Sequence, residues 1–264
     1  MNFQYQRASS AQDAAAKRKA ARDGAFLAGG MTLLPALKLG LTEASDLVDL
    51  APIKDLKGIK AEGAALGIGA MTRHADVAAS AQVKAAIPAL ASLAGGIGDP
   101  QVRHRGTIGG SIANNDPAAD YPAACLGLGA TIVTDQREIA ADQFFTGLFS
   151  TALKPGELIT AVRFPIPLGA AYVKFDNPAS RFAMVGVFVA KAKDGVRVAV
   201  TGAGKGGVFR AKDMESVLTK SFAPDSLKAV NVSEANMASD IHASADYRAH
   251  LVKVIAERAV AACG

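Results

Sequence analysis

The chain has 264 residues, half of them apolar, which is enough to bury the core of one large domain or of two to three small ones. Its formal net charge is +5, but the 29 basic and 24 acidic residues are scattered, and the basic cluster at residues 103–105 lacks the interleaved aromatics that stack on bases. Nucleic-acid binding is therefore not expected. An acidic partner subunit or an anionic cofactor explains the charge at least as well.

The two cysteines, Cys125 and Cys263, are too few to hold an iron–sulfur cluster, which normally takes four thiolates. Any such cluster is expected on a partner chain. Residues 1–12 are polar and lack an apolar signal core, so we expect two reduced thiols in or near a core and a cytoplasmic protein. No stretch approaches the roughly 20 apolar residues of a membrane-spanning helix.

The first two thirds of the chain alternate between strand and helix patterns. Ser9 or Ser10 can cap the first helix, and Ile87-Pro88 interrupts a later one. Residues 95–110 are rich in glycine and are expected to form a long loop, which usually has a function. The expected elements are strands at residues 3–6, 25–28, 47–50, 65–69 and 131–134, and helices at residues 10–22, 75–81, 83–94 and 118–128.

The pattern changes near residues 164–168, where prolines cluster, and we place a domain boundary there. Beyond it, Asp194-Gly195 is a strong hairpin signal between two apolar runs. The last part of the chain is expected to hold strands at residues 183–190 and 196–201, followed by helices at residues 212–218 and 246–262.

Two glycine-rich segments suit phosphate binding. In the first, Gly29 and Gly30 follow an expected strand directly, and positive φ with no side chain lets consecutive amides converge on one point. The second offers the same chemistry and adds the hydroxyls of Thr107 and Ser111, while Ile108 anchors it in the core. Neither is specific alone, because a Gly-Gly pair is more often an ordinary turn.

The second segment runs on into Asp116-Pro117-Ala118-Ala119-Asp120. A carboxylate beside a pyrophosphate would repel it, so Asp120 should face sugar hydroxyls or ring N–H donors. From the residues alone, cofactor contact and an exposed helix position are equally favoured for Asp120. Asp116, before a proline, suits a helix cap.

A third glycine-rich stretch, residues 202–207, matches the spacing of a dinucleotide fingerprint but is expected to be a plain loop. The strand before it fits an antiparallel hairpin, and no βαβ unit surrounds it. It also lacks the Ser or Thr that a P-loop needs after its lysine, since Gly206 follows Lys205.

The four histidines, at positions 74, 104, 242 and 250, show no metal-ligand spacing. His242 and His250 are expected at the surface, and His104 in an exposed loop. No Ser/His/Asp arrangement or nucleophile elbow is evident, so any reaction is expected to reside in a cofactor.

Three strings form a recognisable combination with the two glycine segments: Gln-Val-Arg-His-Arg-Gly-Thr-Ile-Gly-Gly-Ser-Ile-Ala-Asn at 101–114, Pro-Ala-Ala-Asp at 117–120, and Lys-Pro-Gly-Glu-Leu-Ile at 154–159. Together they resemble the FAD-binding medium subunit of molybdenum hydroxylases, the family of xanthine dehydrogenase and aerobic carbon monoxide dehydrogenase. The resemblance covers essentially the whole chain, including His-Ala-Ser-Ala-Asp-Tyr-Arg at 242–248.

This resemblance implies an α+β fold: a PCMH-type FAD-binding module of two subdomains, residues 1–57 and 58–164, and a C-terminal domain, residues 165–264, with a three-stranded antiparallel sheet and a helical bundle. It implies FAD on this chain, a molybdopterin cofactor on a large partner subunit and two [2Fe-2S] clusters on a small one. Electrons would pass from the clusters to the flavin and on to an external acceptor, within a dimer of heterotrimers.

The resemblance also implies the cofactor contacts, with no catalytic residue and no metal ligand on this chain. Asp120 would contact the ribityl or flavin region, Lys174 would lie near the isoalloxazine, and Phe182 would pack against the ring without the hydroxyl of the tyrosine that relatives can have there. Met31 and His104 replace a polar residue and an asparagine common in relatives. The full set is Ala28, Gly29, Gly30, Met31, Thr32, Leu33, Thr107, Ile108, Gly109, Gly110 and Ser111 around the pyrophosphate, with Ile97, Asn114, Asp120, Ile159, Lys174 and Phe182 along the rest of the cofactor.

Two alternatives stay open. A free-standing FAD-dependent oxidoreductase would act on its own small substrate and should carry a substrate domain with acid/base residues, of which the C-terminal region shows no convincing set. A flavin-free interaction module would purify as a colourless protein.

Overall fold

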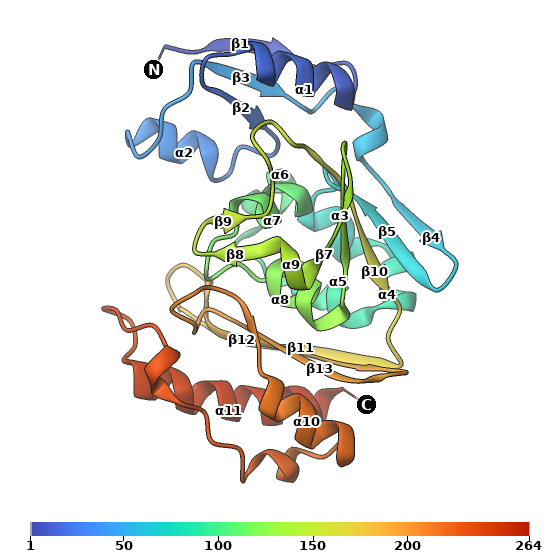
Figure 1. The fold of residues 1–264 in the computed structure, drawn as a ribbon, viewed down its shortest axis with the longest axis vertical. Coiled ribbons are helices and arrows are strands. Elements are labelled where there is room, and N and C mark those ends of the chain that lie inside the picture. Colours follow the sequence, from blue (N-terminus) through green and yellow to red (C-terminus); the bar gives the residue numbers. More distant parts are fainter. Residues whose placement is uncertain (1, 264) are drawn as a thin grey trace.

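The computed structural model describes residues 2–263 and stacks three layers along its long axis (Figure 1). A three-stranded parallel sheet lies at the N-terminal end, a five-stranded antiparallel sheet with helices in the middle, and a four-stranded antiparallel sheet with helices at the C-terminal end. In the part of the chain described, no helix has the length and apolarity to cross a bilayer.

The N-terminal layer is a small βαβ arrangement with strand order β1-β3-β2. Its first helix is capped as expected, since the Ser10 hydroxyl accepts a hydrogen bond from the Asp13 amide at 3.1 Å. Because all three strands are parallel, the loop after β2 leaves the carboxyl edge of the sheet, which is where open α/β sheets bind ligands. The elements are β1 Gln4–Arg7, α1 Ala11–Ala20, β2 Gly24–Leu27, α2 Leu33–Lys38 and β3 Asp46–Asp49, followed by a 3₁₀ turn, η1, at Lys54–Leu56.

The middle layer packs its helices against a sheet of order β4-β5-β10-β6-β7. Its strands are β4 Ile59–Glu62, β5 Ala65–Gly69, β6 Thr131–Thr134, β7 Glu138–Ala140 and β10 Ile159–Pro165, with β8 Phe145–Gly147 and β9 Ser150–Thr151 as a separate hairpin. Its helices are α3 His74–Ala79, α4 Ala81–Ala86, α5 Pro88–Gly95, α6 Pro100–Arg105, α7 Ile108–Asn114, α8 Tyr121–Leu128 and α9 Ala141–Phe144.

Two expectations for this layer are wrong. The glycine-rich stretch is not one long loop: it contains α6 and α7, which begin because the side chains of Asp99 and Thr107 accept amide hydrogen bonds at their N-termini. The next helix begins three residues later than expected, at Tyr121. Asp116 does not cap it, because its carboxylate accepts instead from the Ala118 amide at 2.9 Å in a preceding turn. Strands β4 and β7 to β10 also have no counterpart in the sequence-based set.

The C-terminal layer is an antiparallel sheet of order β11-β12-β13-β14 that takes part in two cores. Phe188 and Ala190 of β12 are buried in the core of the middle layer, whereas the alternate residues Val187 and Val189 pack with α10 and α11. The three long strands agree with the expected three-stranded sheet, and a two-residue strand is added at its edge. The elements are β11 Gly169–Asp176, β12 Ala183–Ala192, β13 Gly195–Thr201, β14 Phe209–Arg210, α10 Lys212–Lys220, η2 Pro224–Leu227, η3 Glu234–Asn236 and α11 Ala245–Ala262.

Residues 202–207 form a loop between the antiparallel strands β13 and β14, as expected for a stretch that only imitates a dinucleotide fingerprint. Both cysteines are buried and free, again as expected. His242 and His250 are exposed, but His104 lies on α6 and not in a loop.

Candidate functional site

The first glycine-rich segment, residues 28–33, leaves β2 and presents unpaired backbone amides. Gly30 adopts a φ of 75°, the left-handed conformation that the sequence led us to expect and that favours glycine. Within residues 2–263, none of the five consecutive amides from Gly29 to Leu33 donates a hydrogen bond. Five adjacent N–H groups with no acceptor form a ready site for an anion.

The first segment touches the chain just before the second one, although some 75 positions separate them. A Cβ on Gly29 would stand 2.1 Å from the carbonyl oxygen of Arg105, so only glycine allows this approach. Further along, a Cβ on Gly110 would lie 3.7 Å from that of Ala28. Figure 1 shows α6 and α7 below the end of β2, with α2 to one side of them. The two segments therefore line one site.

The second segment, residues 107–111, differs from the expected open loop because it is the start of α7. The amides of Ile108 and Gly109 donate to the carbonyls of Thr72 and Ala70, at 3.1 and 2.8 Å. Those of Gly110 and Ser111 donate to the hydroxyl and carbonyl of Thr107. Its amides are thus mostly used inside the protein. The donors left for a ligand are the Thr107 amide and the hydroxyls of Thr107 and Ser111, of which Thr107 is only 3% exposed and Ser111 is partly exposed.

Packing fixes the second segment. Ile108 is fully buried, as expected for its anchor. A Cβ on Gly109 would lie 2.6 Å from the Ala70 Cβ and 2.7 Å from its carbonyl oxygen. This glycine lets α7 lie against the end of β5, and it does so without contributing an open amide.

Asp120 is buried at the junction between the middle and C-terminal layers, with 4% of its surface exposed. The hydroxyl of Tyr172 donates to its carboxylate at 2.5 Å, and the Lys174 ammonium lies 3.3 Å away. The alternative of an exposed helix position is therefore wrong. Burial raises the pKa of the Asp120 carboxyl above its usual value, while Lys174 and Tyr172 oppose that rise.

Lys174 connects this carboxylate to two further segments. Its ammonium donates to the carbonyls of Gly96 and Arg181, both at 2.9 Å. Arg181 has a φ of 61°, a conformation uncommon for a residue with a side chain, and it precedes the half-exposed Phe182. Lys174 thus holds the loop that carries Phe182 against the end of α5.

The remaining residues of the expected set fall into two groups. Ile97 is partly buried, and its backbone carbonyl accepts a hydrogen bond from the Arg103 guanidinium at 2.9 Å. Met31 and Asn114 are at least partly accessible to solvent. Ile159, by contrast, is 4% exposed within β10 and belongs to the core of the middle layer. It offers little surface to a ligand in this structure.

Sequence reasoning missed three polar side chains around the site, of which His74 and Tyr121 are buried and Tyr172 is partly buried. Tyr172 could have been found, because it lies two positions before Lys174 and strand residues at that spacing share a face. His74 and Tyr121 gave no such signal. Their rings lie 5.3 Å apart, and neither the His74 Nδ1 nor the Tyr121 hydroxyl has a hydrogen-bond partner within the described residues.

His74 supports the start of the second segment. Its amide donates to the Gly106 carbonyl at 3.0 Å, and its imidazole Nε2 would lie 2.5 Å from a Cβ at Gly106. Burial lowers the pKa of His74 to about 4, with the nearby positive charge of Arg103 adding to the shift. The ring is therefore neutral at pH 7.

Comparisons with known proteins show which family and which fold the chain resembles. A family model described as the FAD binding domain in molybdopterin dehydrogenase matches residues 1–167. The carbon monoxide dehydrogenase medium chain of Hydrogenophaga pseudoflava is 34% identical, with 90% of this chain and 88% of the relative covered, and that of Afipia carboxidovorans is 36% identical, with 98% and 96% covered. A crystal structure of cyanide-inactivated Cu,Mo-CO dehydrogenase superposes with a TM-score of 0.93 at 35% identity, over 100% of this chain and 98% of that one.

Proposed function

The chain belongs to the family of FAD-binding domains found in molybdopterin dehydrogenases, and we propose from this premise that it is the electron-transfer flavoprotein subunit of a molybdenum-containing hydroxylase or dehydrogenase. It takes electrons from the [2Fe-2S] clusters of a small partner subunit and passes them to an external acceptor. The substrate is oxidised at a molybdopterin cofactor on a large partner subunit, in an assembly of two heterotrimers.

The residues present fit FAD. The open amides of Gly29 to Leu33 and the hydroxyls of Thr107 and Ser111 supply the donors that a pyrophosphate requires, and the contact between Gly29 and Arg105 brings both sets to one place. This split donor set is the observation that carries the proposal. When bound, the flavin supplies the redox chemistry, and the chain supplies position and electrostatics.

Asp120 and Lys174 serve the other end of the cofactor. The two form a buried ion pair, so the carboxylate of Asp120 can accept from sugar hydroxyls while its charge is balanced. Phe182 would pack against the isoalloxazine ring of a bound flavin. Because this side chain has no hydroxyl, it contributes contact area and no hydrogen bond.

The test is purification of the chain from its native host, with an absorption spectrum and metal analysis. We expect a yellow protein that co-elutes with two other subunits, iron and molybdenum. A chain that is stable alone, binds FAD and turns over a substrate without either metal would refute the subunit proposal and favour a free-standing flavoenzyme. A colourless chain would refute both.

A further inference from the structure

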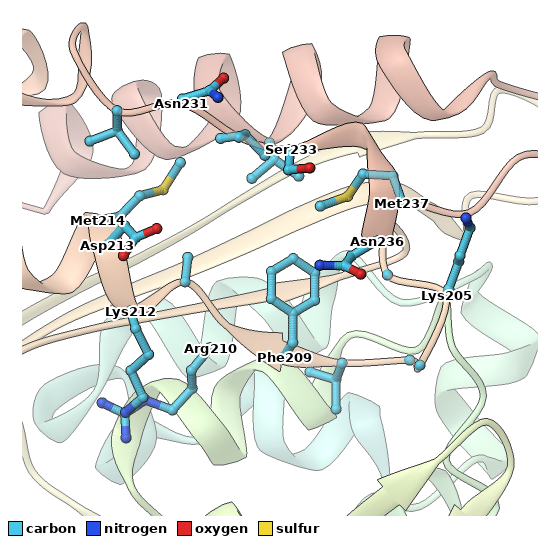
Figure 2. A pocket seen from close by; sticks show the side chains of 18 residues that line it. Lys205, Phe209, Arg210, Lys212, Asp213, Met214, Asn231, Ser233, Asn236 and Met237 are labelled. Atoms are coloured by element: carbon cyan, nitrogen blue, oxygen red, sulfur yellow. The ribbon is translucent and has the colours of Figure 1, made fainter.

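A cavity of about 560 Å³ lies in the C-terminal layer, among elements separate from the proposed FAD site (Figure 2). One wall is the chain from Gly204 to Met214, and the other is the segment from Val230 to Met237. Its buried surface is apolar, formed by Met214, Val230, Met237 and Val252. Its rim carries the exposed polar residues Lys205, Lys212, Asp213, Asn231, Ser233 and Asn236.

The first wall contains an open sheet edge. Strand β14 pairs only with β13, and Ala199 stands opposite Arg210. Because the amide of Ala211 donates to Val198, the bonded positions are those flanking Arg210, and the backbone N–H and C=O of Arg210 point away from the sheet. Arg210 also lines the cavity, so this edge borders it.

The second wall is a strap, residues 230–234, with unused backbone groups. Within the described residues, the backbone N–H and C=O groups of Asn231, Val232 and Ser233 make no hydrogen bond. A second hollow, of about 460 Å³, separates the strap from α11, so the strap has open space on both sides. Backbone N–H and C=O groups that have no partner are available to pair with another chain.

The two walls join at one end and separate at the other. The backbone amide of Lys205 donates to the carbonyl of Asn236 at 2.9 Å, and the amide of Ala238 donates to the carbonyl of Ala203 at 2.7 Å. These two bonds make an antiparallel bridge between Gly204 and Met237. Toward Arg210 and Asn231 no such bond forms, and the cavity fills the gap. A strand of four residues occupies roughly 13 by 5 by 10 Å, or about 650 Å³, so this cavity of about 560 Å³ has room for a strand of three to four residues.

We propose that this slot receives an extended segment of a partner subunit, which adds a strand beside β14 and pairs with the strap. The inference rests on the proposed function, because the occupant belongs to another subunit of the same complex. An apolar side chain of the segment packs on Phe209 and Met237. The Lys212 ammonium lies 3.4 Å from the Glu215 carboxylate, and the Lys205 ammonium donates to the Ala235 carbonyl at 2.9 Å. Lys205 makes no ion pair within the described residues, so its charge favours an acidic residue beside that anchor. A small anion would use Lys205 but would leave both backbone edges unpaired.

Hydrogen exchange tests the proposal directly. We expect the amides of Arg210, Asn231, Val232 and Ser233 to exchange at least tenfold more slowly in the purified complex than in the isolated full-length chain. If a complex with FAD, iron and molybdenum forms while these amides exchange as fast as in the isolated chain, the slot is not a docking site and the proposed function stands. If no complex forms, both ideas fail.

A blocking variant separates insertion into the slot from mere coverage of it. Asn236→Trp places a large ring at an exposed position of the rim, and we expect the affinity of the chain for its partners to fall at least tenfold. Lys220→Trp makes a similar change at an exposed site of α10 outside the cavity and should leave that affinity unchanged. Wild-type assembly of Asn236→Trp, with an unchanged melting temperature and FAD content, would overturn the proposal.

Discussion

The two glycine-rich segments look alike in sequence, yet the structure uses them differently. In the first, the five backbone amides from Gly29 to Leu33 donate no hydrogen bond within the described residues. In the second, the four amides from Ile108 to Ser111 all donate to groups of the protein. We infer that the first is the binding loop and that the second is mainly the frame that holds it. Similar glycine patterns do not imply similar use of the backbone.

The reason is where each segment lies. The first leaves the carboxyl edge of a parallel sheet, with no neighbouring strand to accept its amides. The second begins a helix and runs beside residues 70–74, which take its first two amides. Accordingly, Gly29 is required by the close approach of Arg105, and Gly109 by that of Ala70.

The largest expected effect is on FAD binding when the contact between the segments is broken. In Gly29→Ala the new methyl group would overlap the Arg105 carbonyl, and overpacking of this kind costs about 1–3 kcal/mol, so we expect a roughly 100-fold loss of FAD affinity in a fluorescence titration. Gly206→Ala is the control, because a Cβ there meets no atom within 4 Å. Equal affinity in the two variants would mean that the contact does not shape the site.

Acid should weaken the frame before it affects the binding loop. The folded-state pKa of His74 is about 4, below its ordinary 6.5, so the unfolded chain binds more protons between these values and stability falls as the pH drops from 6.5 toward 4. We expect the contribution of His74 to the free energy of unfolding to fall by about 2 kcal/mol between pH 7 and pH 5, while the raised pKa of Asp120 acts in the opposite direction. Above pH 6.5 this contribution vanishes.

His74→Phe should flatten that pH dependence in urea unfolding measurements, since it removes the titrating group. The carboxyls of Asp13 and Glu157 do not interfere, because their pKa values of about 2 cost stability only as the pH falls below about 4.5. An equal slope in the variant and the wild type would assign the effect to another group.

Ser111→Ala should lower FAD affinity about tenfold and leave stability within about 0.5 kcal/mol. The Ser111 hydroxyl makes no hydrogen bond inside the described part of the chain, so its loss affects only a bound phosphate, to which a hydrogen bond contributes about 1.5–3 kcal/mol. Titration with FAD and thermal unfolding of the apoprotein measure the two effects. A fall in melting temperature with unchanged affinity would reverse the role assigned to this side chain.

The smallest expected effect is on the melting temperature, when the cap of α7 in the second segment is removed. Thr107→Val removes the hydroxyl that caps α7 at Gly110, which costs about 1 kcal/mol, or roughly 2–4 °C in melting temperature for a chain of this length. Thr107→Ser keeps the cap and should melt close to the wild type. If both variants melt together, the cap contributes nothing measurable.

Much of the fold was predictable wherever a local signal was complete. Ser10 caps the first helix, Pro88 divides α4 from α5, and Asp194-Gly195 joins β12 to β13, each as expected. The short helices α6 and α7 were not predicted, because glycine and proline in the same stretch indicate a loop, and capping by Asp99 and Thr107 outweighs that tendency only in the folded chain. Strand β11 begins with Gly-Ala-Ala, which carries little strand signal of its own.

The sequence by itself determined which residue types could meet a phosphate, and its motifs identified the family and the expected FAD site. Only the tertiary structure decided that the amides of one glycine segment stay open while those of the other are used, and that Asp120 is buried with Lys174 and Tyr172. The physical reason is that an amide is available only if no neighbour accepts from it. The acceptors Ala70 and Thr72 are brought to the second segment by packing within the middle layer. The Arg105 carbonyl is brought against Gly29 by the packing of the N-terminal layer on the middle one, and neither arrangement follows from positions in the chain.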